Sequence, residues 1–572
     1  MRIKHIPVML IAICAPAFVS AQVNSTSQDI EGLSWKKGLT AQGGGVSFEN
    51  TFYKGNDSIV NRDPYAFYLT GHLNLNACGV EIPLSFAYSN TSKTYLQSFN
   101  RFQIAPKYKW AQLYIGSNSM MFSKYTLAGH QFTGVGAVLT PRNWEISAMY
   151  GELNKAVEYD SRKENLNSAA YRRMGYGMKV GYAKNGDEVS AIFFHAKDDK
   201  NSLDNPVPDS ANLHPQENTA IQIGGKKTLF KNFYVQAEYA ISIYNSELRD
   251  SLMGNELHGT FIDKVLGRKG NDQHTDAINA STGYQNKRWG VALRYERVSP
   301  NYQTLGGYYF TNDVETYTIA PNVNFFKGKL RLTGNLGFEF NNLDNTKAND
   351  TRRVVGSANI SYATANGFNA VLSYSNFSTY TKYKPESYPF YTDKLDTLNF
   401  YQINQTLTAN TCWSFGNKTG LMNSVALCGS YQYGSEDCGD TTSLSDFVNG
   451  TLNFGEQYMP VKMSWSLFVS GNYCTASGIE QTYWGPGISL GKSLLKDKLS
   501  LNISASYNQS KAEGETAYSV LNSNFSAKYN LPFNKKFGAH SLSLNSSLTN
   551  NYGGTTDGEY EFLTTLKYDI SF

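Results

Sequence analysis

Alternation of apolar and polar residues dominates the chain, and it is clearest at the C-terminus, in EYEFLTTLKYDISF. Every second residue there is mostly apolar, and the residues between them are mostly polar or charged. A period of two predicts a β-strand with one apolar and one polar face. The apolar set is Tyr560, Phe562, Thr564, Leu566, Tyr568, Ile570 and Phe572.

The same alternation recurs along the sequence. Residues 233–243 (FYVQAEYAISI), 330–340 (LRLTGNLGFEF) and 498–510 (KLSLNISASYNQS) each place apolar side chains on one face and polar ones on the other. Each run has about ten residues, which is enough for a tilted strand to cross a bilayer.

The connections between these runs fall into two classes. Twelve are tight and often basic, such as KGK at 327–329 and KDK at 496–498, and thirteen are longer, polar and rich in Asp and Asn. Twenty-five connections predict about 26 strands, within a range of 22–28, because boundaries taken from sequence slip by a few residues.

Short turns alternating with long loops and an even strand count are typical of a transmembrane antiparallel up-and-down β-barrel with both termini in the periplasm. The alternative is a soluble sandwich array or propeller, which needs a fixed repeat. Successive tight turns are 29 to 56 residues apart. The sequence therefore predicts an all-β membrane barrel.

Composition agrees with this prediction. Tyr 40, Phe 32 and Gly 49 accompany only 17% charged residues, and the mean hydropathy is -0.41. Barrel strands escape hydropathy tests designed for helices because only alternate residues face lipid. A net charge of +4 on 572 residues gives no reason to expect a nucleic-acid partner.

The N-terminus predicts export. Arg2 and Lys4 precede an apolar run from Ile6 to Phe18, and small residues lead to Ala21. This pattern is typical of a signal peptide, here residues 1–21. Residues 22–42 then form a short periplasmic segment before the barrel, residues 43–572. That segment is too short for a separate plug domain, so none is predicted.

The end of the last strand resembles the C-terminal assembly signal of outer-membrane proteins. The resemblance depends on Leu566, Tyr568, Ile570 and Phe572. An unpaired final strand is what a barrel-assembly machinery could bind by strand addition. An alternative role for Phe572 is that of a membrane-interface anchor only.

The expected lumen face is neutral and polar. Asn, Ser, Thr and Gln dominate it, with scattered charges such as Arg294 with Glu296 and Arg331 with Glu339. Such a wall favours neutral hydrophilic solutes and gives little ion selectivity. The segment from Arg249 to His274 is a candidate to fold inward, and a surface loop is the alternative.

Two cysteines are candidates for a disulfide. Cys412 and Cys428 are equidistant from residue 420, at the centre of their tight turn, and parity places both on the lumen face. Directly opposed residues lie within disulfide range, so a cross-strand disulfide is predicted, with two free thiols as the alternative. Cys438 and Cys474, near outer loops, form a second candidate pair.

Motifs for catalysis and for metal binding are absent from the sequence. It has no C-x-x-C and no H-E-x-x-H, and its match to G-x-S-x-G, GISLG at 487–491, is not the strand-to-helix elbow that this motif requires. We therefore predict no catalytic, cofactor-binding or metal-binding residues, no cofactor, and no enzymatic activity.

One block is less generic: SMMFSKYTLAGHQFTGVGAVLTPRNWEISAMYGELNKAVEYD, followed by YRRMGYGMKVGY and IFFHAKDD. Together these resemble large, poorly characterised outer-membrane β-barrel proteins of Bacteroidota-type bacteria, most clearly over residues 32–245. The resemblance implies fold and location and carries no activity. The block's small and aromatic residues could line a partner-facing wall or a lumen constriction, or Gly134, Gly136 and Gly151 could serve ordinary barrel packing.

Two functions therefore stay open. The first is a channel for hydrophilic solutes, passive or gated by a partner. The second is a structural or assembly scaffold of an outer-membrane or secretion complex with an occluded lumen. Outer-membrane lipid is the expected surrounding in both, and a lipoprotein or periplasmic protein is the expected kind of partner.

Overall fold

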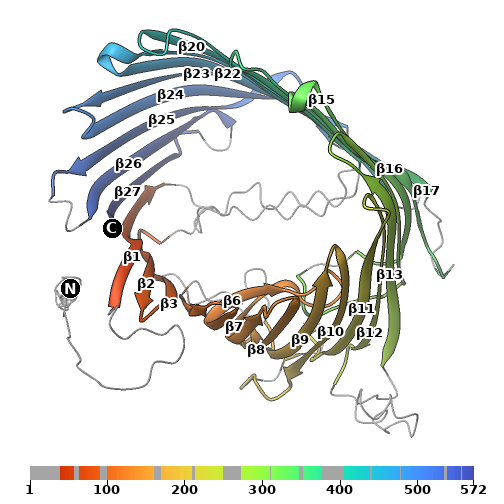
Figure 1. Cartoon of the computed structure of the whole chain (residues 1–572). Helices are drawn as coiled ribbons and strands as arrows, with labels where there is room; N and C mark the ends of the chain where they lie inside the picture. The colour runs from red at the N-terminus through yellow and green to blue at the C-terminus, as the bar shows by residue number, and fades with distance from the viewer. Residues whose placement is uncertain are drawn as a thin grey trace, which may run out of the picture.

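The strands pair antiparallel in chain order and return to the start, so that the computed structural model is a closed β-barrel (Figure 1). It describes residues 39–56, 63–90, 100–159, 169–205, 207–208, 213–248, 272–308, 311–344, 346, 352–376, 405–438, 441–476, 478–533, 538–554 and 557–572. The predicted signal peptide and the segment from Arg249 to 271 lie outside these residues.

The strand bounds follow the predicted alternation closely. β12, β16 and β24 contain the three quoted runs, except for Lys498 at the start of the third. The first strand begins at Leu39, ahead of the predicted start at residue 43. The strands are β1 Leu39–Gly55, β2 Tyr65–Ala77, β3 Val80–Ser89, β4 Arg101–Ile104, β5 Lys107–Tyr108, β6 Ala111–Met121, β7 Ala128–Leu139, β8 Trp144–Asn154, β9 Arg172–Lys184, β10 Asp187–Asp199, β11 Glu217–Leu229, β12 Phe233–Asn245, β13 Gln273–Gln285, β14 Trp289–Val298, β15 Val314–Phe325, β16 Leu330–Asn341, β17 Arg352–Ala363, β18 Phe368–Ser375, β19 Gln405–Gly416, β20 Leu421–Cys438, β21 Thr441–Tyr458, β22 Met463–Ala476, β23 Ile479–Leu494, β24 Leu499–Ala512, β25 Glu515–Leu531, β26 Ala539–Tyr552 and β27 Tyr560–Ser571, with short 3-10 turns at Phe326–Gly328 and Met459–Val461.

The chain crosses the barrel wall from rim to rim 26 times, as the connections predicted, and each such passage is called a crossing. The 27 strand segments give this number because β4 and β5 both lie between β3 and β6 and form one interrupted crossing. Pro106 stands at the interruption, where a residue without an amide proton cannot donate to the ladder.

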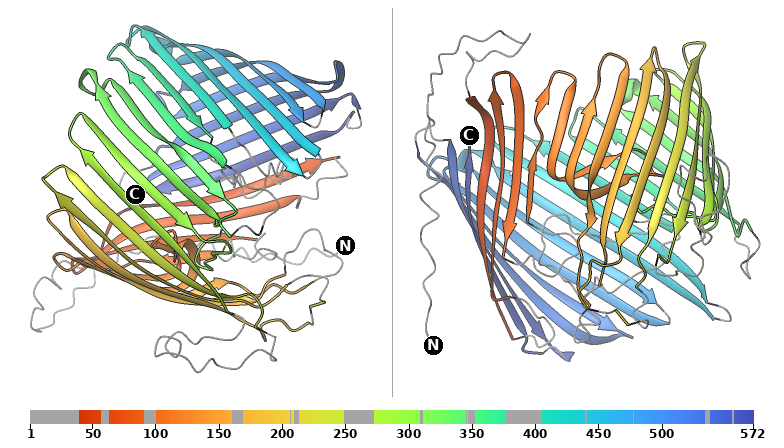
Figure 2. Two further views of the ribbon diagram at one scale, coloured as in Figure 1. Left: turned by 90° about the vertical axis from the view of Figure 1, so that its right-hand side faces the viewer. Right: turned by 90° about the horizontal axis from the view of Figure 1, so that it is seen from below.

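The two rims differ as expected. One rim, here the turn rim, carries the short connections, and β1 starts and β27 ends there. The opposite rim, here the loop rim, carries the longer connections, although those after β20, β22 and β24 are as short as the turns. Figure 2 shows the tilted strands running between the two rims.

The outward face is apolar. On β12, Val235, Tyr239 and Ile241 are exposed, whereas Gln236 and Glu238 point inward. The same alternation places Leu336 and Phe338 of β16 on the outside. Among the described residues, no helix is long and apolar enough to span a membrane.

Aromatic residues edge the apolar face near the turn rim. Exposed tryptophans lie at the start of β8 and β14, near the end of β19, and in the turn before β6: Trp144, Trp289, Trp413 and Trp110. Exposed tyrosines and phenylalanines such as Phe52, Tyr65 and Tyr88 lie near the loop rim. Two aromatic girdles around an apolar band are the external pattern of a barrel in a bilayer.

The seam between the first and last strands closes the sheet. Val46 pairs with Ile570, and the backbones of Gly44 and Phe572 exchange hydrogen bonds of 2.8 and 3.0 Å. On the other side of β1, Gly44 approaches β2 so closely that a Cβ would lie 2.5 Å from the carbonyl oxygen of His72, which requires a glycine at this position.

We therefore expect Gly44→Ala to weaken the closed barrel by about 1–3 kcal/mol, because the clash is with backbone. The measurement is the temperature at which the folded protein loses its fast mobility on gels. Gly450→Ala is the matched control, since the nearest atom to its added Cβ lies 3.9 Å away. Equal melting of the two variants would contradict the role assigned to Gly44.

Candidate functional site in the barrel interior

The interior is the candidate site, because a barrel of 26 crossings is wider than its wall side chains can fill. Barrel diameter grows with strand number, and barrels of about 16–18 strands already enclose an aqueous channel. What lines and enters this space therefore decides what the barrel can do.

Two connections from the loop rim turn inward and meet. The first is residues 122–127, between β6 and β7, and the second is residues 299–308, between β14 and β15. Both lie over the inner face of the strands from β7 to β14. The Tyr302 hydroxyl donates to the Tyr125 carbonyl at 2.7 Å, and the Thr304 hydroxyl donates to that of Thr126 at 2.6 Å. We call this pair of segments the ledge.

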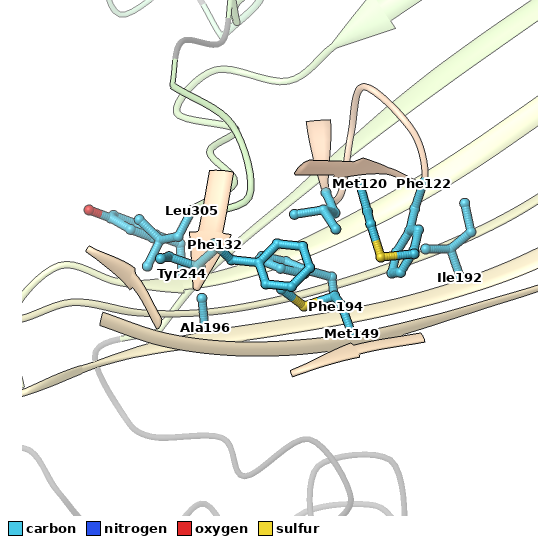
Figure 3. Close-up of a cluster of buried hydrophobic side chains, with 11 residues drawn as sticks. Met120, Phe122, Phe132, Met149, Ile192, Phe194, Ala196, Tyr244 and Leu305 are labelled. Carbon is cyan, nitrogen blue, oxygen red and sulfur yellow. The ribbon is translucent and has the colours of Figure 1, made fainter. Parts of the chain in front are cut away.

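An apolar layer fixes the ledge to the wall. In Figure 3, Tyr244 and Leu305 lie at one end of this layer, Phe122 and Ile192 at the other, and Phe194 between them. The layer comprises Met120, Phe122, Leu127, Phe132, Met149, Leu153, Ile192, Phe194, Ala196, Tyr244 and Leu305, all buried. It is a hydrophobic core on the inside of a barrel.

Glycines make room for this layer. A Cβ on Gly177 of β9 would lie 3.0 Å from the Phe122 ring, and one on Gly136 of β7 would lie 2.8 Å from the Met120 sulfur. Gly134 and Gly151 instead face backbone across the β7–β8 ladder, where a Cβ would lie 2.1 and 2.7 Å from carbonyl oxygens. The glycines of the quoted block thus serve both a lumen-filling layer and close strand packing.

Two buried side chains of the wall hold the backbone of the ledge. Asn218 donates to Ser242 at 2.7 Å, and its carbonyl oxygen accepts from the Leu305 amide at 3.2 Å. Ser242 donates to the Gln303 carbonyl at 2.6 Å. Since Asn218 and Ser242 have no exposed surface, these neutral hydrogen bonds fix the ledge in one position.

A carboxylate holds the tip of the ledge. Glu296 accepts from the Lys124 ammonium at 2.6 Å and from the Tyr125 hydroxyl at 2.9 Å. Burial, and then the Glu296 charge, raises the pKa of Tyr125 well above its ordinary value. Burial, followed by the charge of Asp276, likewise raises the pKa of Tyr302. Both phenols are therefore neutral hydrogen-bond donors at ordinary pH.

A buried ion pair supports the wall beside the ledge. Arg173 of β9 and Asp198 of β10 form a two-pronged contact of 2.7 and 2.9 Å. Gln216 completes it, because its side chain accepts from Arg173 at 3.0 Å and its amide donates to Asp198 at 3.0 Å. The Asp198 side chain is 3% exposed, so its charge depends on these partners.

The wall from β17 to β26 is chemically different. Of its described lumen-facing side chains, only Lys528 and Glu515, which opens β25 at the loop rim, carry a charge. Asparagine, serine, threonine and glutamine predominate. Examples on β17, β19, β21, β22, β24 and β26 are Asn359, Asn410, Asn453, Asn472, Asn502 and Asn545. We call this surface the neutral wall.

The remaining wall, β1 to β16 with β27, carries the other described lumen charges, several of them paired. Lys179 contacts Glu145 at 3.0 Å, and Lys567 contacts Asp569 at 3.1 Å. The predicted lumen-facing charges Arg294, Glu296, Arg331 and Glu339 belong to this part and face inward.

The register corrects the predicted opposition of Cys412 and Cys428. Both lie on the lumen face as expected, but Cys412 pairs with Ala426, and Cys428 pairs with Asn410. Diagonal neighbours have Cα atoms about 7–8 Å apart, outside disulfide range. Both are free cysteines in the structure. The turn at 417–420 is centred before residue 420, which displaces the register by two residues.

The second candidate pair is also separated. Cys474 lies level with Phe447 and Gln432, six residues before Cys438 along β20. Cys474 is a free cysteine.

Three residues of the predicted assembly signal, Leu566, Tyr568 and Ile570, lie on the outer face of β27, and Phe572 directly follows this strand. Leu566 and Phe572 are exposed to the surroundings. Tyr568 lies beside His540 of β26, its hydroxyl 2.7 Å from Nδ1. Their recognition by an assembly machinery stays a prediction.

The ledge was not predicted from the sequence. A signal for it was present, because the connection FSKYTL at 122–127 carries Phe122, Tyr125 and Leu127 where other loops are polar. The predicted inward segment, Arg249–His274, lies almost entirely outside the described residues. Within the part of the chain that is described, no group of three or more His, Cys, Asp or Glu is arranged to hold a metal ion.

No model of a known protein family matches the chain, and no curated protein matches its sequence. Solved barrels are similar at low identity. The P pilus usher (PapC) translocation pore is 11% identical, covers 93% of this chain and 99% of its own, and has a TM-score of 0.37. OccAB2 of Acinetobacter baumannii is 8% identical, covers 94% of this chain and 99% of its own, and has a TM-score of 0.29. Similarity at this level carries no activity over to this chain.

We expect Arg173→Met to destabilise the barrel by about 3–5 kcal/mol, because it leaves the Asp198 carboxylate buried without its partner. Urea unfolding in detergent micelles, followed by tryptophan fluorescence, measures the change. The double variant Arg173→Met with Asp198→Leu removes both charges and should recover much of the loss. Costs that simply add would show that the two residues do not depend on each other.

Proposed function

We propose that the chain is an outer-membrane channel for neutral hydrophilic solutes. The observation that carries this proposal is the neutral wall, which runs over β17–β26 with Lys528 and, at the loop rim, Glu515 as its described lumen-facing charges. A lining of amides and hydroxyls exchanges hydrogen bonds with a polar solute and offers no fixed field to select an ion. The exterior suits this location, since an apolar band lies between aromatic girdles.

The proposal includes the placement of the chain. Residues 1–21 would direct export, residues 22–42 would remain in the periplasm, and the barrel of a Gram-negative, Bacteroidota-type bacterium would place its turn rim there. Both ends of the barrel sheet lie at that rim, which is consistent with periplasmic termini.

The ledge supplies the narrowing that such a channel needs. It occupies the sector of the interior over β7–β13, and its contacts are buried and specific. A solute passing this level would move between the ledge and the neutral wall. Narrowing by an inward segment restricts size, while the neutral wall leaves charge selection weak.

The second candidate is a scaffold for an outer-membrane or secretion complex. The ledge also favours this function, because an apolar core inside the barrel reduces the space for permeation. A lipoprotein or periplasmic protein would then dock on the barrel, and its stoichiometric co-purification from native membranes would support this function.

Single-channel recording of purified protein in a planar bilayer tests the proposal. We expect a steady conductance, with a reversal potential close to zero in a potassium chloride gradient. Strong ion selectivity would contradict the neutral wall as the lining of the path. Silence from protein proven folded by its heat-shifted gel mobility would instead favour the scaffold.

Leu305→Asp tests whether the ledge narrows the path. A charge in the apolar layer should release residues 299–308, and single-channel conductance should then rise. Gln303→Asp is the matched control, because it adds the same charge at an exposed side chain two residues away. Unchanged conductance in Leu305→Asp, with the barrel still folded, would show that the ledge does not limit permeation.

A further inference from the structure

Four aromatic side chains interrupt the neutral wall. Their positions along the strands alternate in step with the lumen-facing asparagines and serines around them, so they face the lumen too. They are Phe447 of β21, Phe468 of β22, Tyr483 of β23 and Tyr518 of β25. We call these four residues the aromatic patch. Lipid cannot account for them, because the outward positions on these strands are occupied by residues such as Leu467 and Val469.

The register places three of the rings close together, and it places Phe468 two inward-facing steps nearer the turn rim, because Phe468 pairs with Gly487 whereas Tyr483 pairs with Asn472. Tyr483 and Tyr518 both pair with Ser510 from its two sides, so two strand spacings separate them, about 10 Å. Phe447 lies one inward-facing step nearer the loop rim, since it pairs with Cys474 while Tyr483 pairs with Asn472. The aromatic patch is therefore a surface formed by side chains of several strands, not by one side chain alone.

Glycine allows one ring to lie across the wall. A Cβ on Gly487, opposite Phe468, would lie 2.1 Å from the Phe468 ring. The ring thus occupies the space where the next strand would have a side chain. On the same strand a Cβ on Gly485 would lie 1.9 Å from the Asn508 amide oxygen. Glycine at these positions brings an aromatic ring and an amide onto one surface.

Neutral polar groups surround the patch. Asn449, Asn472 and Asn522 lie in the same or adjacent lumen-facing rows. Amides and hydroxyls both donate and accept hydrogen bonds. None of the described lumen-facing residues of β21–β24 is charged, so the surface offers no counter-ion for an acidic or basic ligand.

The patch faces the ledge across the interior. β10, which lies beneath the ledge, is the ninth crossing, and β23 is the twenty-second of 26, half the circumference away. Figure 1 shows β23 and β24 on the opposite side of the barrel from β9 and β10. A solute excluded from the ledge sector is thereby directed along the patch.

We propose that the aromatic patch binds neutral oligosaccharides. A sugar ring has a face of weakly positive C–H groups, which stack on the negative face of an aromatic ring, and a rim of hydroxyls that exchange hydrogen bonds with amides. Rings about 10 Å apart suit a chain of linked sugars better than a monosaccharide. This inference deepens the proposed function and rests on it for the route of the ligand.

The test uses maltohexaose as the probe with the full-length protein in planar bilayers. Maltohexaose should block the current at a defined concentration, and polyethylene glycol of equal hydrodynamic size should block far less. In the double variant Phe468→Ala with Tyr483→Ala, the half-blocking concentration should rise at least tenfold. Phe468→Tyr should stay near the wild type, because it keeps the ring.

Tyr507→Ala is the matched control, since it removes an aromatic side chain from the lipid face of β24. An unchanged half-blocking concentration in the double variant would overturn the inference, as would equal block by the polymer.

A second measurement separates this inference from the channel itself. Saturation-transfer NMR of maltohexaose with the detergent-solubilised protein reports binding without any current. If the protein is silent in bilayers, the proposed function fails. A saturation-transfer signal from maltohexaose with the wild-type protein, lost with the double variant, would still support the sugar site. Absence of this signal with the wild-type protein would refute the sugar site.

Discussion

Closure of the sheet is the constraint on which the rest of the structure depends. Within a bilayer, each unpaired backbone group costs several kcal/mol, so a spanning sheet is stable only when its last strand pairs with its first. Here β27 meets β1 over a continuous register from Gly45 with Ser571 to Gly55 with Glu561. An antiparallel ring that closes this way requires an even number of crossings, which the interrupted strand β4–β5 preserves.

Closure at 26 crossings has a consequence for the interior. The circumference is too large for wall side chains to meet at the centre, so the polar inner face would be uniform if nothing entered it. The chain instead divides the interior into unlike parts. Segments from two loops cover β7–β13 with an apolar layer, and the opposite wall is nearly uncharged. Function can therefore depend on a path between the two parts rather than on a central axis.

The fold was predictable from sequence because its signal is repeated in every strand. A period of two and alternating turn lengths gave the strand number, and errors of a few residues at each boundary do not change it. The interior was less predictable. Cys412 and Cys428 show why, since a two-residue displacement in the turn keeps both on the lumen face yet separates them. The ledge depends on contacts between residues such as Tyr125 and Tyr302, which no local pattern relates.

The ledge also makes stability uneven around the ring. Apolar residues on the outer face gain little from the hydrophobic effect, because lipid is as apolar as they are. Burial from water is available only inside, and most of the fully buried large side chains, including Tyr125, Phe194 and Tyr302, belong to the ledge or lie beneath it. This sector is therefore packed like the core of a soluble protein. The neutral wall depends mainly on its backbone ladder, so its side chains remain available to a solute that passes between the two.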